Sequence, residues 1–132
     1  MALDDTLALP FFDDGHRRFA EEISRWADAK LHSLPHDDVD AACRARVRAL
    51  GEAGFLKAVV PSSHGGLHPV LDVRTLCIAR EVLAFRDGLA DFAFAMQGLG
   101  TGSISLGIPT ARGTSTPETN ASSSTRIPIA TG

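Results

Sequence analysis

The stretch FFDDGHRRFAEEISRWADAKLHSL, residues 11–34, decides the fold class of this chain. Its apolar residues recur at steps of three and four, a spacing that places them on one face of an α-helix, and most of its charged residues lie opposite. Asp13 or Asp14 can cap the first turn, and Pro35 ends the helix. Because such an apolar face is unstable alone in water, we expect other helices to cover it.

Two further helices are predicted beyond Pro35, over residues 39–53 and 72–86. Gly54 ends the first, because glycine tolerates the left-handed conformation that follows many helices. Asp72 is expected to cap the second. The inner faces are predicted to carry Val39, Cys43, Val47 and Leu50 in the first helix, with Arg44, Arg46 and Arg48 largely outside, and Val73, Leu76, Cys77, Arg80, Leu83 and Ala84 in the second.

A fourth helix is predicted over residues 88–106, with small residues that favour close approach of another backbone. Residues 55–60 are expected to be extended, because a residue that precedes a proline avoids the helical region, and residues 62–66 to form a turn. Almost no apolar residues alternate with period two. The predicted fold class is therefore all-α, a helical bundle of about four helices.

The composition changes after the fourth helix. Between Thr110 and Arg126, nine of seventeen residues are Ser or Thr, and none is large and apolar. Such a segment buries too little surface to offset the entropy lost on ordering. We predict a helical domain over residues 1–107 and a disordered tail over residues 108–132.

Charge and composition exclude several classes of function. Thirteen Lys and Arg against sixteen Asp and Glu, a net charge of -3, argue against a nucleic-acid partner. Two cysteines form no disulfide framework, and the acidic N-terminus is unlike a secretion signal or a mitochondrial presequence. Residues 92–111 carry no charge, but four glycines, Pro109 and polar residues argue against a membrane span. We expect a soluble cytoplasmic protein.

No catalytic, cofactor-binding or metal site can be assembled from the residues alone. The run Gly98–Gly102 has neither the preceding strand nor the glycine spacing of a dinucleotide loop. Two histidine pairs have the four-residue spacing of a helical zinc site, but a proline or glycines interrupt each of them. Cys43 and Cys77 fall on expected apolar faces, where a thiol is usually inert. The pairs are His32 with His36 and His64 with His68.

Five pieces, taken in order, resemble the N-terminal helical domain of the acyl-CoA dehydrogenases. The most specific is VPSSHGG at residues 60–66, which is similar to the family's Val-Pro-x-x-(aromatic)-Gly-Gly turn with a histidine at the aromatic position. The resemblance covers about residues 11–107. The other four pieces are FAEEI at residues 19–23, ALGEAGFL at 49–56, EVLAFRD at 81–87, and Leu99-Gly100 with Ile104.

The resemblance implies a flavin-dependent oxidoreductase of lipid metabolism. In the family a carboxylate removes the α-proton of an acyl-CoA thioester and a hydride passes to FAD; that base and most of the flavin site lie in later domains. We therefore expect a truncated chain, cut by a frameshift near Leu106, that binds no FAD alone, is catalytically inert and self-associates through exposed apolar helix faces. The alternative is a non-catalytic helical module that binds a partner protein.

The resemblance also implies which residues would contact the substrate. In the family the acyl chain runs beside the fourth helix, and the aligned positions form one wall of its pocket. Phenylalanine, alanine and methionine suit such a lining, and an aspartate there favours a short or polar-tailed acyl group. In the alternative interpretation, the Phe and Met are ordinary core residues. The wall positions are Asp91, Phe92, Ala95, Met96 and Leu99.

Overall fold

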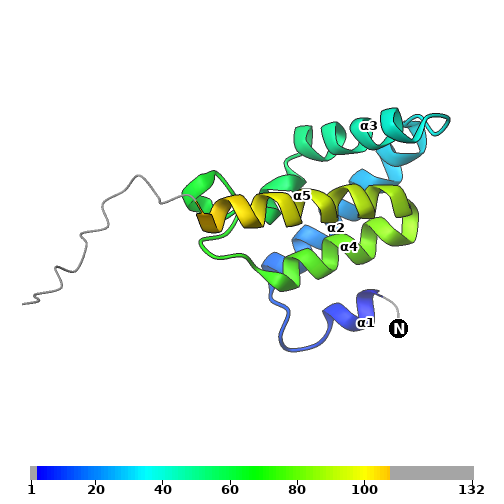
Figure 1. The fold of residues 1–132 in the computed structure, drawn as a ribbon. Helices are drawn as coiled ribbons and strands as arrows, with labels where there is room; N and C mark the ends of the chain where they lie inside the picture. The colour runs from blue at the N-terminus through cyan, green and yellow to red at the C-terminus, as the bar shows by residue number, and fades with distance from the viewer. Residues whose placement is uncertain (1–2, 108–132) are drawn as a thin grey trace, which may run out of the picture.

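The computed structural model describes residues 3–107, and within them the chain is all-α (Figure 1). The α-helices are α1 (Leu3–Leu7), α2 (Asp14–Lys30), α3 (Val39–Glu52), α4 (Val73–Arg86) and α5 (Gly88–Gly107). Three 3₁₀ turns join them, η1 (Leu31–Ser33), η2 (Phe55–Val59) and η3 (Ser62–His64). The four long helices are those predicted, and the short α1 was not predicted. The expected disordered tail, residues 108–132, lies outside the described residues.

Local capping signals decide where the long helices begin. Asp13, Asp38 and Asp72 each have extended backbone, and each side chain accepts hydrogen bonds from amides of the following turn. After α3, Gly54 adopts the left-handed conformation at φ +84°, as predicted. These ends depend on the nearest few residues, which is why they were predictable.

The long helices lie side by side in the order α2, α4, α5, α3 (Figure 1). Helix α4 contacts α2 on one side and α5 on the other, and α3 packs against α5. One hydrophobic cluster runs through all of them and reaches Leu7 of α1. Ile23, Leu50, Leu83 and Phe94 are almost completely buried at its centre.

The predicted inner faces of α3 and α4 were wrong in part. In α3 the buried residues are Ala42, Arg46, Ala49 and Leu50, while Val39 is exposed. Its small alanines allow α3 to approach its neighbours more closely than the valine face would. Helix α4 carries apolar residues on every side, so spacing alone selects no face; it buries Thr75, Ile78, Ala79, Val82 and Leu83, and exposes Val73, Cys77 and Arg80.

The segment 55–60 is not extended as predicted. Residues 55–59 form the 3₁₀ turn η2, which begins when the amide of Lys57 donates to the carbonyl of Gly54 at 3.1 Å. Only Val60, the residue directly before Pro61, is extended, at φ -128° and ψ 136°. The proline constrains its immediate predecessor alone.

Candidate functional site

Helix α5 has one buried face and one exposed apolar face. Ala90, Ala93 and Phe94 are buried against the other helices. Of the five predicted wall residues, Phe92 is 55% exposed, Met96 41% and Leu99 65%. The remaining two, Ala95 and Asp91, are half-buried. The alternative that Phe92 and Met96 are core residues is therefore wrong for the described part of the chain.

Asp91 is held by a neighbouring helix rather than left free. The Arg80 guanidinium of α4 donates from Nε to Asp91 Oδ1 at 2.8 Å and from Nη2 to Oδ2 at 2.9 Å. This two-bond geometry is the strong form of an arginine–carboxylate pair. The hydrogen bonds to Asp91 also raise the pKa of Arg80. Because its charge is paired, Asp91 does not argue for a polar-tailed acyl group.

A groove of about 450 Å³ runs between α3 and α5. Phe92, Ala93, Met96 and Gln97 line it from α5, so it adjoins the exposed apolar face. Helix α3 supplies Cys43, Val47 and two arginines. Ligand pockets commonly have volumes of 300–1,000 Å³, roughly, with apolar walls and a few polar groups. The groove has both properties, with Arg44, Arg48 and Gln97 as its polar groups.

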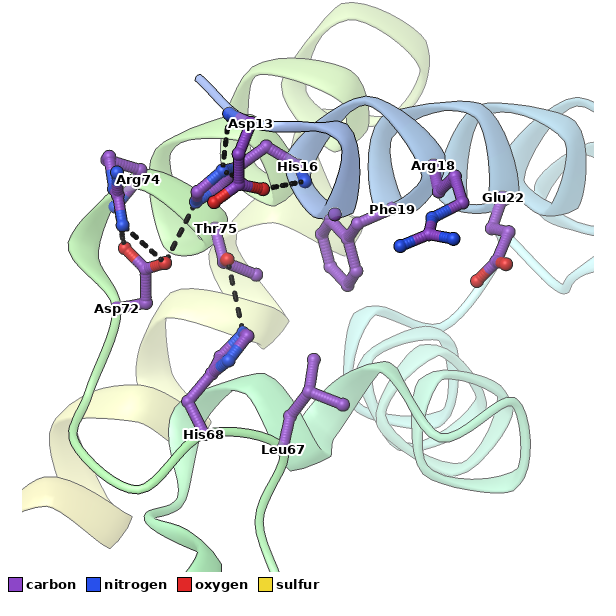
Figure 2. A pocket seen from close by; sticks show the side chains of 11 residues that line it. Asp13, His16, Arg18, Phe19, Glu22, Leu67, His68, Asp72, Arg74 and Thr75 are labelled. Carbon is purple, nitrogen blue, oxygen red and sulfur yellow. Dashed lines mark hydrogen bonds and ion pairs between the residues drawn. The ribbon is translucent and has the colours of Figure 1, made fainter. Parts of the chain in front are cut away.

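A second pocket, of about 480 Å³, lies where α2 and α4 begin (Figure 2). Its central group is the His16 imidazole, whose Nε2 lies 2.8 Å from Asp72 Oδ2. Nδ1 lies 3.1 Å from the Asp13 amide and 2.9 Å from Asp13 Oδ1. A neutral ring accepts from that amide and donates its Nε2–H to Asp72; a charged ring donates to both carboxylates. In either state His16 ties α2 to α4.

The other polar groups of this pocket also satisfy one another. Arg74 donates from its amide and from Nε to Asp72, and the hydroxyl of Thr75 lies 3.3 Å from His68 Nε2 (Figure 2). Burial opposes ionisation of Asp72, but hydrogen bonds from Arg74 and His16 outweigh it and lower its pKa well below the usual value. Among the side chains that the structure describes, no buried polar atom lacks a partner and no group of three or more ligands could hold a metal ion. This pocket fastens two helices together.

A buried arginine links three segments, and the sequence interpretation had placed it outside. Arg46 is 1% exposed; its Nε donates to Asp87 Oδ2 at 2.9 Å and its Nη1 to the Pro35 carbonyl at 2.9 Å. Asp87 accepts, in addition, from the amides of Leu89 and Ala90 at the start of α5. Nothing in the spacing of α3 distinguishes Arg46 from the arginines two residues to either side. Only its position opposite Asp87 does.

The Gly-Gly turn at residues 65–66 has a separate reason for each glycine. Gly65 has φ +88°, a conformation that side chains with a Cβ rarely adopt. A Cβ on Gly66 would overlap the carbonyl oxygen of Val60. The turn is closed by the Gly66 amide, which donates to Pro61 at 3.0 Å, and the Ser62 amide, which donates to His68 at 2.7 Å. The pattern Pro-x-x-x-Gly-Gly therefore specifies a backbone shape.

The glycines at 98, 100 and 102 lie inside α5. Their amides belong to the helix, so this run forms no phosphate-binding loop of the dinucleotide type. A Cβ on Gly98 would meet Val59 at 3.4 Å, an ordinary van der Waals distance, and a Cβ on Gly100 or Gly102 would meet no described atom within 4 Å. The expected close approach of another backbone is therefore not seen at these three glycines. None of the described helices is long and apolar enough to cross a membrane.

Comparison with protein families identifies the family of this chain. The family model described as the acyl-CoA dehydrogenase N-terminal domain matches residues 13–110. These residues include all four long helices and the Gly-Gly turn between α3 and α4. No curated protein matches the chain.

Proposed function

This chain belongs to the acyl-CoA dehydrogenase family through its N-terminal domain, and from that premise we propose that α5 supplies one wall of an acyl-thioester binding site. The observation that carries the proposal is the exposed apolar face of α5, formed by Phe92, Met96 and Leu99. These side chains would contact the alkyl part of the acyl group. The whole protein would be a flavin-dependent oxidoreductase of lipid metabolism, acting in the cytoplasm on the CH–CH group of acyl-CoA.

The contrast between the two faces of α5 supports this role. A helix of a closed bundle normally buries its large apolar residues and exposes polar ones. Helix α5 instead buries two alanines and Phe94, and exposes a phenylalanine, a methionine and a leucine. Because each of the three is about half exposed, each forgoes roughly half of the 1.5–3 kcal/mol that complete burial of such a side chain contributes. An apolar ligand or another domain would recover that free energy.

Within residues 3–107 we find no glycine-rich loop at a helix N-terminus of the kind that holds the pyrophosphate of a dinucleotide such as FAD. The glycine run lies within α5, and Arg74 and Arg80 are already paired with Asp72 and Asp91. In this class of reaction the flavin accepts the hydride. We assign no residue within 3–107 to binding the flavin. We assign to this chain only the binding of the acyl group and the exclusion of water from it.

Titration with hexanoyl-CoA, followed through backbone amide resonances, tests the proposal. We expect shifts centred on residues 91–99 with hexanoyl-CoA and not with CoA alone. The triple variant F92Q/M96Q/L99Q should weaken binding at least about fivefold, because it removes three apolar contacts. Phe85→Gln is the matched control, since Phe85 is 87% exposed on α4 and away from this face. Equal shifts with CoA, or an unaffected triple variant, would refute the proposal.

The exposed apolar face of α5 would also suit the second candidate function, a helical module that binds a partner protein. That function predicts no preference for an acyl thioester, so the titration separates the two. We also expect the chain alone to self-associate and to show no turnover with FAD, acyl-CoA and an artificial electron acceptor. Light-scattering mass and an acceptor assay on one sample measure both. Sustained turnover by a monomer would contradict this expectation.

A further inference from the structure

We propose that the groove between α3 and α5 binds an anionic amphiphile of the fatty-acid type. Arg44 and Arg48 bind its carboxylate, and its alkyl chain lies against Val47, Phe92 and Met96. The groove holds about 450 Å³ and is lined by both helices (α3 in cyan and α5 in yellow in Figure 1). Among the described residues that line it, the charged ones are the two arginines, and most of the others are apolar.

The two arginines of the groove form no ion pair. Of the nine arginines within residues 3–107, five pair with an aspartate and four do not, and Arg44 and Arg48 are the members of the second group that line the groove. Asp40 and Glu52 stand one helical turn before and after this pair, but neither is joined to it in the described structure. The other two without an ion pair are Arg18 and Arg25 of α2. The five paired residues are Arg17, Arg46, Arg74, Arg80 and Arg86.

The two guanidinium groups can act on one anion. Arg44 and Arg48 are four residues apart in α3, so they lie one above the other on the same helix face. No carboxylate lines the groove, and the nearest one on α5, Asp91, is already bound by Arg80. The groove therefore presents two positive charges that form no ion pair in the described structure, beside an apolar surface. A carboxylate that carries an alkyl chain satisfies both at once.

The apolar side of the groove suits an alkyl chain of variable shape. Met96 has an unbranched, flexible side chain that adapts to a ligand, and Phe92 offers a large flat surface. Both are about half exposed, at 41% and 55%, so a ligand would cover them without any rearrangement of the core. Cys43 lies in the same lining and is partly accessible.

This inference goes beyond the acyl wall of the proposed function. The arginines lie on α3, and the ligand needs neither a thioester nor CoA. Leu99 belongs to the acyl wall and does not line the groove. Leu99→Gln should therefore weaken hexanoyl-CoA binding and leave the binding of a simple fatty acid unchanged, so that the two proposals fail independently.

Protection of Cys43 from modification tests the groove directly. The probe is decanoate, below its critical micelle concentration, and the reagent is Ellman's disulfide, with each site quantified by peptide mass spectrometry. We expect decanoate to slow the modification of Cys43 at least about fivefold, because the ligand covers the lining. Cys77 is free and exposed on α4 and serves as the internal control, with its rate unchanged.

Matched ligands and variants test the charge. Decylammonium and decanol should bind at least about tenfold more weakly than decanoate, and R44Q/R48Q should lose the same factor. Arg25→Gln, an exposed arginine on α2, should change nothing. Added salt should weaken the binding of decanoate to the unchanged chain. Equal protection by decylammonium, equal slowing of Cys77, or an unaffected double variant would each overturn the proposal.

Discussion

Helix α3 carries an arginine on each of two faces, and helix α5 carries a phenylalanine on each of two faces. In each helix one of these side chains is buried and the other is exposed. On the inner faces Arg46 and Phe94 are both only 1% exposed. On the groove faces lie Arg48, which has no ion pair within residues 3–107, and Phe92, which is 55% exposed. The two members of each pair are two positions apart in one helix. The contrast shows that a side chain's position relative to the neighbouring helices, and not its residue type, decides whether it is buried in the fold or exposed to a ligand.

The largest effect is expected when the buried arginine is removed. Arg46→Ala should lower the free energy of unfolding by about 3–5 kcal/mol, because a buried side chain is removed and Asp87 keeps only its hydrogen bonds from the Leu89 and Ala90 amides. Arg48→Ala on the groove face should change it by less than about 0.5 kcal/mol. Urea denaturation of both variants measures the difference. Similar losses would mean that the two faces of α3 are not distinct.

The phenylalanine pair of α5 should show the next largest effect. Phe94→Ala should cost about 4 kcal/mol, since it leaves a cavity in the core. Phe92→Ala should cost less than about 1 kcal/mol, because half of its surface already meets water. Thermal and urea unfolding of the two variants compare them. A large loss for Phe92→Ala would show that the described chain covers this face.

The ion pair between Arg46 and Asp87 should make the stability of the fold sensitive to acid. Burial raises its pKa, but hydrogen bonds from Arg46 and from the Ala90 and Leu89 amides, with the Arg46 charge, outweigh burial and leave it below the model-peptide value of 3.8. A lowered folded pKa stabilises above the unfolded value, and this contribution is lost as pH falls through the folded value.

Asp87→Asn should therefore cost roughly 2 kcal/mol at pH 7 and make stability less dependent on pH below about 4. Urea midpoints measured at a series of pH values from neutral to acid give this slope. Arg44→Gln is the groove-face control and should keep the slope of the unchanged chain. If Asp87→Asn leaves the dependence of stability on pH unaltered, the ion pair between Arg46 and Asp87 does not contribute to stability as described.

The smallest effect concerns the glycines of α5. Gly100→Ala should raise the free energy of unfolding by about 0.5–1 kcal/mol, because an added Cβ meets no neighbour and alanine favours the helix. Gly98→Ala should gain at least as much, since its Cβ would make an ordinary van der Waals contact with Val59 at 3.4 Å. Differential calorimetry of both variants measures the two gains. A loss of stability in Gly98→Ala would show that Val59 cannot accommodate the added Cβ.

The sequence by itself determined the helices, their caps and the family. Asp72 and Gly54 were predicted, and Asp13 was one of two alternatives, because each acts through amides and dihedral angles within a few residues. The Gly-Gly turn at residues 65–66 is equally local. Gly65 has a positive φ, and a Cβ on Gly66 would overlap the backbone of Val60, six residues earlier. The resemblance built on these pieces agrees with the family match over residues 13–110.

Only the tertiary structure decided which face of each helix is buried. Helices α4 and α5 are apolar on more than one side, so their spacing allowed several packings, and α3 turned its alanines and Arg46 inward. The partners of Arg46 and His16 are 41 and 56 residues away, Asp87 and Asp72, and no periodicity carries that information. A long-range pair is chosen by the packing of whole helices. The groove and its two unpaired arginines are what this packing leaves exposed.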